Sequence, residues 1–366
     1  MKESKVLEDF NKEVGDDAKV IDDNNKKALE KAKKNIVYLL IFSVFMVFAG
    51  FSSAYIVSMG DAFWLKVPFP PAFWVSTIVI LLSSVLIQTA VYFSRRDNKS
   101  GLKLATAGTL ILGLAFLYFQ FKGYGQLVDN GIHAANNRIV VTDGKYGDYF
   151  EVKTDEGFIE VNGNDYLMNG KELSKKEMKS LQGFMGQFLK FELTKPFNVS
   201  EYGKYRLYFR SKEMKLEGGQ LKTKEGESLD LLDRERLYFL ALNIRDGRGD
   251  FFVKGKMGKD FHVYYKGKEL EYINRNLHMN GLPLSPYLQL KAMESADTSS
   301  SFLYILTFWH LLHIVISLFF VIAVVIRSFT GVISSENNIF LRTTSIFWHF
   351  LGVLWIYLLL FLLFIH

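Results

Sequence analysis

The sequence contains no cysteine. Disulfide bonds, cysteine-ligated iron–sulfur clusters and cysteine-based copper or zinc sites are therefore excluded. Charge of one sign is not concentrated either, because 44 Lys and Arg are interspersed with 38 Asp and Glu in a chain of formal net charge +6. This balance is typical of a solvated surface and argues against a nucleic-acid partner.

The residues that dominate are apolar, since 49% of the chain is hydrophobic and 15% is aromatic. They are grouped into runs of about 20 residues, the length that crosses a bilayer as a helix. No run contains Asp or Glu, so the runs hold no carboxylate proton relay of their own. A charged, polar segment precedes the first run, which is too long for a signal-peptide core. We predict an integral membrane protein whose spans are residues 36–58, 72–94, 102–122, 302–326 and 344–366.

Positive residues in the short connections predict the orientation, because they mark the cytoplasmic side of a membrane. The connection between the first two spans offers only Asp61 and Lys66 and is expected outside. The N-terminus is therefore expected in the cytoplasm, and residues 127–300 and the C-terminus outside it. The residues that decide this orientation are Lys26, Lys27, Lys31, Lys33, Lys34, Arg95, Arg96, Lys99, Lys103, Arg327 and Arg342.

The segment 127–300 is too long for a loop and is expected to fold as a mixed α+β domain. Alternating patterns predict strands, and SKKEMKSLQGFMGQFLKF predicts a helix with one apolar face. GDYF and GDFF are each followed by GKEL, but over 147–170 and 249–267, so a duplication stays open. From 136 to 298, 27 Lys and Arg stand against 25 Asp and Glu, which indicates a solvated surface. The predicted strands lie in NRIVVTDG, DYFEVKTDEGFIEV, KYRLYFR and DFHVYYKG, and the helix face carries Met178, Leu181, Phe184, Phe188 and Leu189.

Two histidines, His310 and His313, lie inside the fourth run. Positions three apart share a helix face, and an ionisable pair facing lipid would be costly, so we expect both to face protein. One interpretation is haem ligation with His349 as the partner, although the helical rise places His349 roughly 7 to 12 Å deeper. The interpretation that the depths favour is packing and hydrogen bonding between helices or to a lipid headgroup.

The order of motifs resembles subunit III of the haem–copper cytochrome c oxidases. The family carries an HxLH element near the start of a late helix, present here as His310-Leu-Leu-His313. Its last helix opens with W-H-F-x-x-V-x-W, present here as WHFLGVLW from Trp348 to Trp355. Earlier, FAGFSSAY (48–55), FPP (69–71), LLSS (81–84) and FQFKGYGQLVDNGI (119–132) follow the family's helices in order. The resemblance covers residues 36–133 and 300–366 and corresponds to the five-helix bacterial form.

This resemblance implies an all-α transmembrane bundle of five helices in the bacterial inner membrane. It also implies a subunit without its own active site, cofactor or metal, which stabilises the catalytic subunit, supports proton uptake and binds lipid. Haem and copper would belong to the partners, oxidase subunit I as the main contact and subunit II. The residues expected to serve lipid or subunit packing are His310, His313, Trp309, Trp348, His349, Trp355, Gln120 and Tyr124.

Three positions depart from the family pattern. The carboxylate of the first shared helix falls on Val44, the Glu after the Gln of the third falls on Gly123, and the Asp after W-H-F falls on Gly352. Any role that depends on those carboxylates is therefore in doubt, whereas helix packing and lipid clefts do not require them.

The sequence thus divides into a charged cytoplasmic segment 1–35, helices one to three in 36–126, an inserted extracytoplasmic domain 127–300 and helices four and five in 301–366. The family pattern does not cover the insertion, which we expect to contact an upstream cytochrome c or quinol-oxidising complex through residues 136–298. Two other classes remain open. One is a membrane-anchored receptor or assembly factor that acts through the external domain, and the other is a b-type cytochrome.

Overall fold

The computed structural model describes residues 2–135, 138–199 and 203–365, with side chains from Lys27 onward. Most side chains of the predicted cytoplasmic segment 1–35, and His366 at the predicted outer end, lie outside the described residues. The chain divides into two compact units. We call them the helical unit (Met1–Ser53, Pro71–Gly123 and Leu306–Ile365) and the sheet unit (chiefly Ala54–Pro70 and Tyr124–Ile305).

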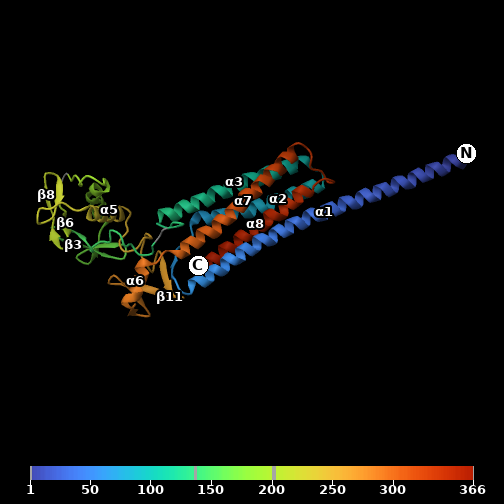
Figure 1. Cartoon of the computed structure of the whole chain (residues 1–366). Helices are drawn as coiled ribbons and strands as arrows, with labels where there is room; N and C mark the ends of the chain where they lie inside the picture. Colours follow the sequence, from blue (N-terminus) through green and yellow to red (C-terminus); the bar gives the residue numbers. More distant parts are fainter. Residues whose placement is uncertain (1, 136–137, 200–202, 366) are drawn as a thin grey trace. The chain divides into compact units, whose positions relative to one another are not determined.

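Five helices among the described residues are long and apolar enough to cross a membrane (Figure 1). The first four each contain one predicted span, and the fifth, which ends at Phe364, covers the predicted span 344–366 up to that residue. A sheet-containing region lies between the third and fourth of them, which confirms this part of the prediction. The first helix begins at Lys2 and so runs through the predicted charged segment. The five helices are α1 (Lys2–Met59), α2 (Pro71–Arg95), α3 (Lys99–Asp129), α7 (Thr298–Phe329) and α8 (Ile339–Phe364).

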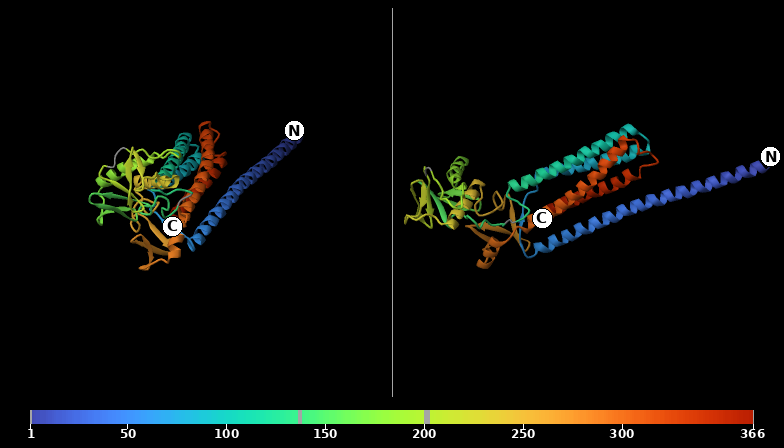
Figure 2. Two further views of the ribbon diagram at one scale, coloured as in Figure 1. Left: turned by 60° about the vertical axis from the view of Figure 1, so that its left-hand side comes forward. Right: turned by 45° about the horizontal axis from the view of Figure 1, so that its top comes forward.

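Local sequence accounts for the helix ends in the helical unit. Pro71 is the first residue of α2, where the missing N–H of proline costs nothing. After α7, Gly331 adopts φ +76°, a conformation that glycine reaches without strain. Between these ends α2, α3, α7 and α8 run alongside one another in every view (Figures 1 and 2). Small residues allow this close approach. A Cβ added to Gly113 on α3, for example, would lie only 2.7 Å from Leu318 Cδ2 on α7.

The sheet unit contains a six-stranded sheet of order β5-β4-β3-β2-β6-β7, a five-stranded sheet of order β1-β10-β11-β12-β13 and the hairpin β8-β9. The apolar face predicted from residue 178 to residue 189 packs into its core, which confirms that helix. The elements of this unit are β1 (Phe63–Lys66), β2 (Phe150–Thr154), β3 (Gly157–Asn162), β4 (Asp165–Met168), β5 (Lys171–Glu172), α4 (Lys175–Met185), the short 3-10 helix η1 (Gly186–Leu189), β6 (Arg206–Phe209), β7 (Lys212–Glu213), β8 (Lys215–Glu217), β9 (Gln220–Lys222), α5 (Leu231–Arg245), β10 (His262–Tyr265), β11 (Lys268–Ile273), β12 (Asn276–Met279), β13 (Leu282–Pro283) and α6 (Pro286–Glu294).

These strands and helices form three copies of one motif, in which successive antiparallel hairpins lead into a capped helix. We call them repeat 1 (147–185), repeat 2 (206–245) and repeat 3 (258–294). Repeats 1 and 3 each have four strands joined by three hairpins, in which the second strand is shared by the first two hairpins. In repeat 2 the shared strand is interrupted at Met214, between β7 and β8. The three helices begin after side-chain caps at Ser174, Asp230 and Ser285, which accept hydrogen bonds from the first turn.

Repeats 1 and 3 agree down to single hydrogen bonds. The amide of Gly147 donates to the Phe150 carbonyl over 3.0 Å, and that of Gly258 donates to Phe261 over 2.8 Å. The turn before the last strand is Asn-Gly with positive φ in both, at Asn169-Gly170 and at Asn280-Gly281, the sequence that such hairpin turns favour. Because these positions keep a constant sequence offset, the two repeats align without a gap.

The structure contains a repeated motif, and it shows why GDYF, GDFF and the two GKEL segments left a duplication open at the level of sequence. At the constant sequence offset between repeats 1 and 3, GKEL at 170–173 is equivalent to GLPL at 281–284. The other GKEL, at 267–270, belongs to the first hairpin of repeat 3. The two GKEL segments therefore are not equivalent. The strand predicted in NRIVVTDG was wrong within the described part of that segment, where Arg138 and Val140 make isolated bridges to Ala296 and Phe251. The other three predicted strand segments contain β2, β3, β6 and β10 and are confirmed.

The repeats associate through their first strands. Strand β2 of repeat 1 pairs antiparallel with β6 of repeat 2, with Val152 opposite Leu207. Repeat 3 has no such partner, and β10 instead pairs with β1, with Val263 opposite Leu65. Strand β1 lies between α1 and α2, in the stretch that the sequence indicated as a short outer connection. This stretch is therefore an integral part of the sheet.

Candidate functional site

His310 lies at the centre of the packed helices. Its side chain is fully buried on α7, stacked on the Trp355 ring of α8 at 5.4 Å between ring centroids. The Phe116 ring of α3 meets it edge-on at 6.0 Å. Phe116 also meets Trp355 edge-on at 5.6 Å, so the three rings form one aromatic cluster. This cluster joins α3, α7 and α8.

Hydrogen bonds to hydroxyl groups of α2 surround this cluster. Trp355 Nε1 donates to Thr77 Oγ1 over 2.8 Å, and Trp348 Nε1 donates to Ser83 Oγ over 3.1 Å. Gln120 Nε2 on α3 donates to Ser76 Oγ over 2.9 Å. All of these side chains are buried, and such bonds between helices stabilise packing where no water competes. Sequence reasoning singled out the donors but missed Ser76 and Thr77, whose only signal was a polar pair in an apolar run.

His313 and Trp309 are less buried and contact α1. The His313 ring lies 6.0 Å from Phe48, and the Trp309 ring lies 6.4 Å from Phe51. His313 Nδ1 is 2.6 Å from the Trp309 carbonyl of its own helix. The two histidines of the HLLH motif therefore contact different neighbours, because His310 meets α3 and α8 whereas His313 meets α1.

His349 and Tyr124 contact residues that do not belong to the aromatic cluster. His349 Nε2 lies 3.2 Å from Gln88 Oε1 on α2, within hydrogen-bonding distance. His310, in contrast, contacts the rings of Trp355 and Phe116. Tyr124 belongs to the sheet unit, where its ring stacks on Tyr304 at 5.4 Å. Of the eight residues predicted for packing, the structure thus brings together His310, Trp355, Trp348 and Gln120 through α2 and Phe116.

The three positions where the resembling family carries carboxylates are closely packed here. Val44 is 4% exposed. A Cβ built on Gly123 would lie 2.2 Å from Phe73 Cε1, closer than any normal contact, and one on Gly352 would lie 3.1 Å from Ser84 Oγ. Phe73 and Ser84 therefore occupy the space into which side chains at 123 and 352 would point.

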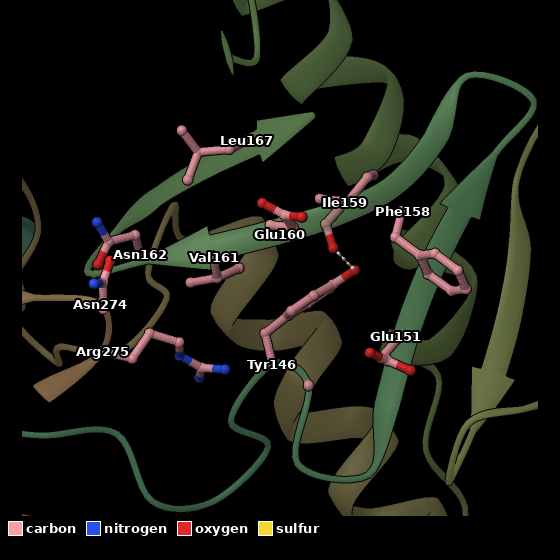
Figure 3. Close-up of a pocket in the computed structure, with 11 residues that line it drawn as sticks. Tyr146, Glu151, Phe158, Ile159, Glu160, Val161, Asn162, Leu167, Asn274 and Arg275 are labelled. Atoms are coloured by element: carbon pink, nitrogen blue, oxygen red, sulfur yellow. Dashed lines mark hydrogen bonds between the residues drawn. The ribbon is translucent and has the colours of Figure 1, made fainter. Parts of the chain in front are cut away.

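The sheet unit holds a hollow of about 680 Å³ (Figure 3). Glu151 and Glu160 line it from β2 and β3, with Arg275 at its other end. Arg275 Nη2 is paired with the buried Asp250, whose Oδ1 lies 2.6 Å away. The unpaired charges of the lining are therefore acidic, a composition suited to cationic groups.

Tyr146 fixes the shape of this hollow by holding two strands apart. Its hydroxyl accepts from the Val152 amide over 2.8 Å and donates to the Ile159 carbonyl over 2.7 Å (Figure 3). Burial raises the pKa of Tyr146, so the hydroxyl stays protonated and keeps its donor at physiological pH. Sequence analysis gave no signal for this site, because its residues come from repeats 1 and 3.

Comparison with protein-family models and with curated proteins finds no match to the chain. Within the described ranges, no group of three or more His, Asp or Glu side chains is placed to hold a metal ion. The arrangement of both sites suits binding and packing, and the buried aromatic and hydroxyl cluster is the more completely built of the two.

Proposed function

We propose that the chain is a non-catalytic membrane subunit of an aerobic haem–copper oxidase, equivalent to subunit III of the cytochrome c oxidases. The observation that supports this proposal is the aromatic cluster and the bonds around it. Residues from the quoted motifs, including His310, Trp348, Trp355 and Gln120, meet across α2, α3, α7 and α8. If the chain packs its helices as the resembling family does, motifs that are distant in sequence are expected to meet in one interior.

In this proposal the five helices form an all-α transmembrane bundle in a bacterial inner membrane, with an inserted α+β domain outside the cytoplasm. The bundle stabilises oxidase subunit I, contacts subunit II and supports proton uptake, while haem and copper are held by those partners. Lipid binding is supported by an apolar hollow of about 110 Å³ in the helical unit. It is lined by Val37, Leu40, Phe320, Phe340, Thr343, Thr344 and Phe347.

The proposal is tested by purifying the full-length chain through a C-terminal tag in mild detergent. We expect haem absorbance, copper and two further membrane subunits to co-purify in fixed ratio with the tagged chain. Purified chain that carries neither haem proteins nor copper would contradict the proposal. It would favour the receptor or assembly-factor alternative, which acts through the external domain.

The same preparation separates the packing and haem-ligation interpretations of the histidines. In a variant with His310→Ala and His313→Ala, the haem-to-protein ratio of the assembled complex should equal that of the parent. The ring nitrogens of His310 have no hydrogen-bond partner among the described residues, so what the variant loses at this position is the stacking on Trp355 and the edge-on contact with Phe116. Such aromatic pairs are worth about 0.5 to 1.5 kcal/mol each, so a looser complex is expected. Loss of one haem per complex with the subunits still assembled would support ligation and the b-type cytochrome alternative.

We further propose that residues 136–298 contact an upstream cytochrome c or quinol-oxidising complex. The acidic lining of the 680 Å³ hollow, with Glu151 and Glu160, supports a basic partner surface. An oxidase carrying Glu151→Gln and Glu160→Gln should retain its turnover with a small artificial electron donor while its association with the donor complex weakens. Unchanged association at low ionic strength would argue against this surface.

Topology can be tested directly because the chain has no native cysteine. In intact cells, an impermeant thiol reagent should label Cys at position 176 and leave Cys at positions 100 and 335 unlabelled. Lys176 is exposed on α4 and preferable to Ser174, which caps that helix. Labelling of Ser100→Cys together with protection of Lys176→Cys would invert the proposed orientation.

A further inference from the structure

Repeat 3 differs from repeat 1 in the chemistry of its outer surface. Leu282, Tyr287 and Leu290 are 71%, 72% and 55% exposed, and we call these three residues the apolar patch. At the equivalent positions repeat 1 carries Lys171, Lys176 and Lys179, all exposed, and repeat 2 carries Glu227, Leu232 and Glu235. The same fold and similar exposure therefore hold lysines in one repeat and large apolar side chains in another.

The patch consists of residues on α6 and on strand β13, which both adjoin β12. Leu282 pairs with Met279, and Gln289 of α6 hydrogen-bonds to the backbone of Leu277. Tyr287 and Leu290 are three positions apart and share a face of the helix. Leu282 belongs to β13, immediately before the Ser285 cap. Three large apolar side chains gathered at this exposure, with no charged residue among them, indicate a surface that contacts another apolar phase.

Repeat 3 is also the repeat that is attached to the ends of two apolar helices. Strand β10 pairs along its full length with β1. In β1, Trp64 Nε1 donates to the Tyr55 hydroxyl of α1 over 3.3 Å, and the Leu65 carbonyl accepts from Ser299 Oγ of α7 over 2.5 Å. These contacts all lie within the sheet unit, and they fix repeat 3 to the last turns of α1 and the first turns of α7.

The short connection after repeat 3 also attaches this repeat to an apolar helix. Helix α6 ends at Glu294 and α7 begins at Thr298. Even a fully extended chain would hold these two residues no more than about 14 Å apart. Repeats 1 and 2 have no comparable attachment, since α3 ends at Asp129 and the first strand of repeat 1 begins at Phe150. The repeat with the apolar patch is thus the one held where the apolar helices end.

We infer that repeat 3 rests on the membrane surface, with Leu282, Tyr287 and Leu290 inserted among the interfacial lipids. A tyrosine suits this position because its ring is apolar and its hydroxyl reaches the headgroups. This inference does not depend on the oxidase assignment, because it uses only the apolar helices and the contacts of repeat 3.

The test uses the full-length chain in vesicles of phosphatidylcholine and phosphatidylglycerol, with one spin-labelled cysteine at 282, 287 or 290. Cysteines at 171, 176 and 179 are matched controls on the same motif. Power saturation compares collisions with oxygen, which concentrates in lipid, and with a water-soluble nickel chelate. We expect the oxygen-to-nickel ratio to be several-fold higher at the patch than at the control positions.

Each other outcome overturns the inference. Equal ratios at patch and control positions would show that the patch faces water. Labels at the patch that are immobile and shielded from both reagents would show a protein contact, either a second copy of the chain or another subunit. All six positions are exposed, so labelling should leave the thermal stability of the parent chain unchanged, and each labelled variant is first checked for that.

Discussion

Replacing Trp355 with alanine is expected to disrupt the helical unit more than replacing any other ring of the aromatic cluster. The side chain is fully buried between His310, Phe116 and Phe73, and its indole N–H donates to Thr77. Removing a buried tryptophan costs about 3 to 5 kcal/mol in well-packed interiors. Thermal unfolding of the detergent-purified chain, followed by size-exclusion chromatography, should show a strongly lowered midpoint.

Two variants show whether the loss arises from packing. Trp355→Phe keeps one aromatic ring but removes the pyrrole ring and its hydrogen bond to Thr77, so its cost should lie below that of Trp355→Ala. Leu360→Ala, on the same helix at a side chain that is 47% exposed, should leave the midpoint near that of the parent. A Trp355→Ala chain as stable as the parent would show that the aromatic cluster does not hold α8 in place.

Adding a side chain at Gly123 should be the second most damaging change. The Cβ of alanine would lie 2.2 Å from Phe73 Cε1, so Phe73 must move, and overpacking of this kind costs about 1 to 3 kcal/mol. The glutamate that the resembling family carries there should cost more, because a carboxylate would be added beside a buried ring. Unfolding midpoints of Gly123→Ala and Gly123→Glu measure the two effects.

The clash itself is isolated by a double-mutant cycle with Phe73→Leu, which opens space next to position 123. Gly123→Ala should cost less in the Phe73→Leu background than in the parent, which gives a favourable coupling between the two changes. Gly125→Ala is the control on the same helix, because a Cβ there meets nothing within 4 Å. Helix propensity predicts that it is neutral or stabilising by up to about 1 kcal/mol. Equal costs of Gly123→Ala in both backgrounds would contradict a clash with Phe73.

The five long helices could be predicted because a run of apolar residues carries its own length and periodicity. The three repeats could not be predicted, because the sequence motif that recurs, GKEL, does not occupy equivalent positions in the structure. What the repeats share is turn geometry and alternate apolar positions, such as Phe150 with Phe261 and Val152 with Val263. Strand β1 gave no signal either, since its pairing with β10 is a contact between distant parts of the chain.

The candidate site was predictable in composition but not in arrangement. A spacing of three places His310 and His313 near one face, yet it does not say which neighbouring helix each will meet. In the structure that choice depends on Trp355, which stacks on His310, on Phe116, which meets it edge-on, and on Phe48, which lies by His313. The helical period supplies the direction of a side chain, and only the packing of the other helices supplies its partner.

The pairing of first strands has a consequence for how such a chain can change in length. Because β2 and β6 satisfy each other, repeats 1 and 2 form a couple, while repeat 3 is completed by β1. Removal of one repeat of the couple would leave an uncovered strand edge, which invites aggregation. Removal of both would uncover no further edge, because the remaining sheet keeps the order β1-β10-β11-β12-β13, so we expect the sheet unit to tolerate the gain or loss of repeats in pairs.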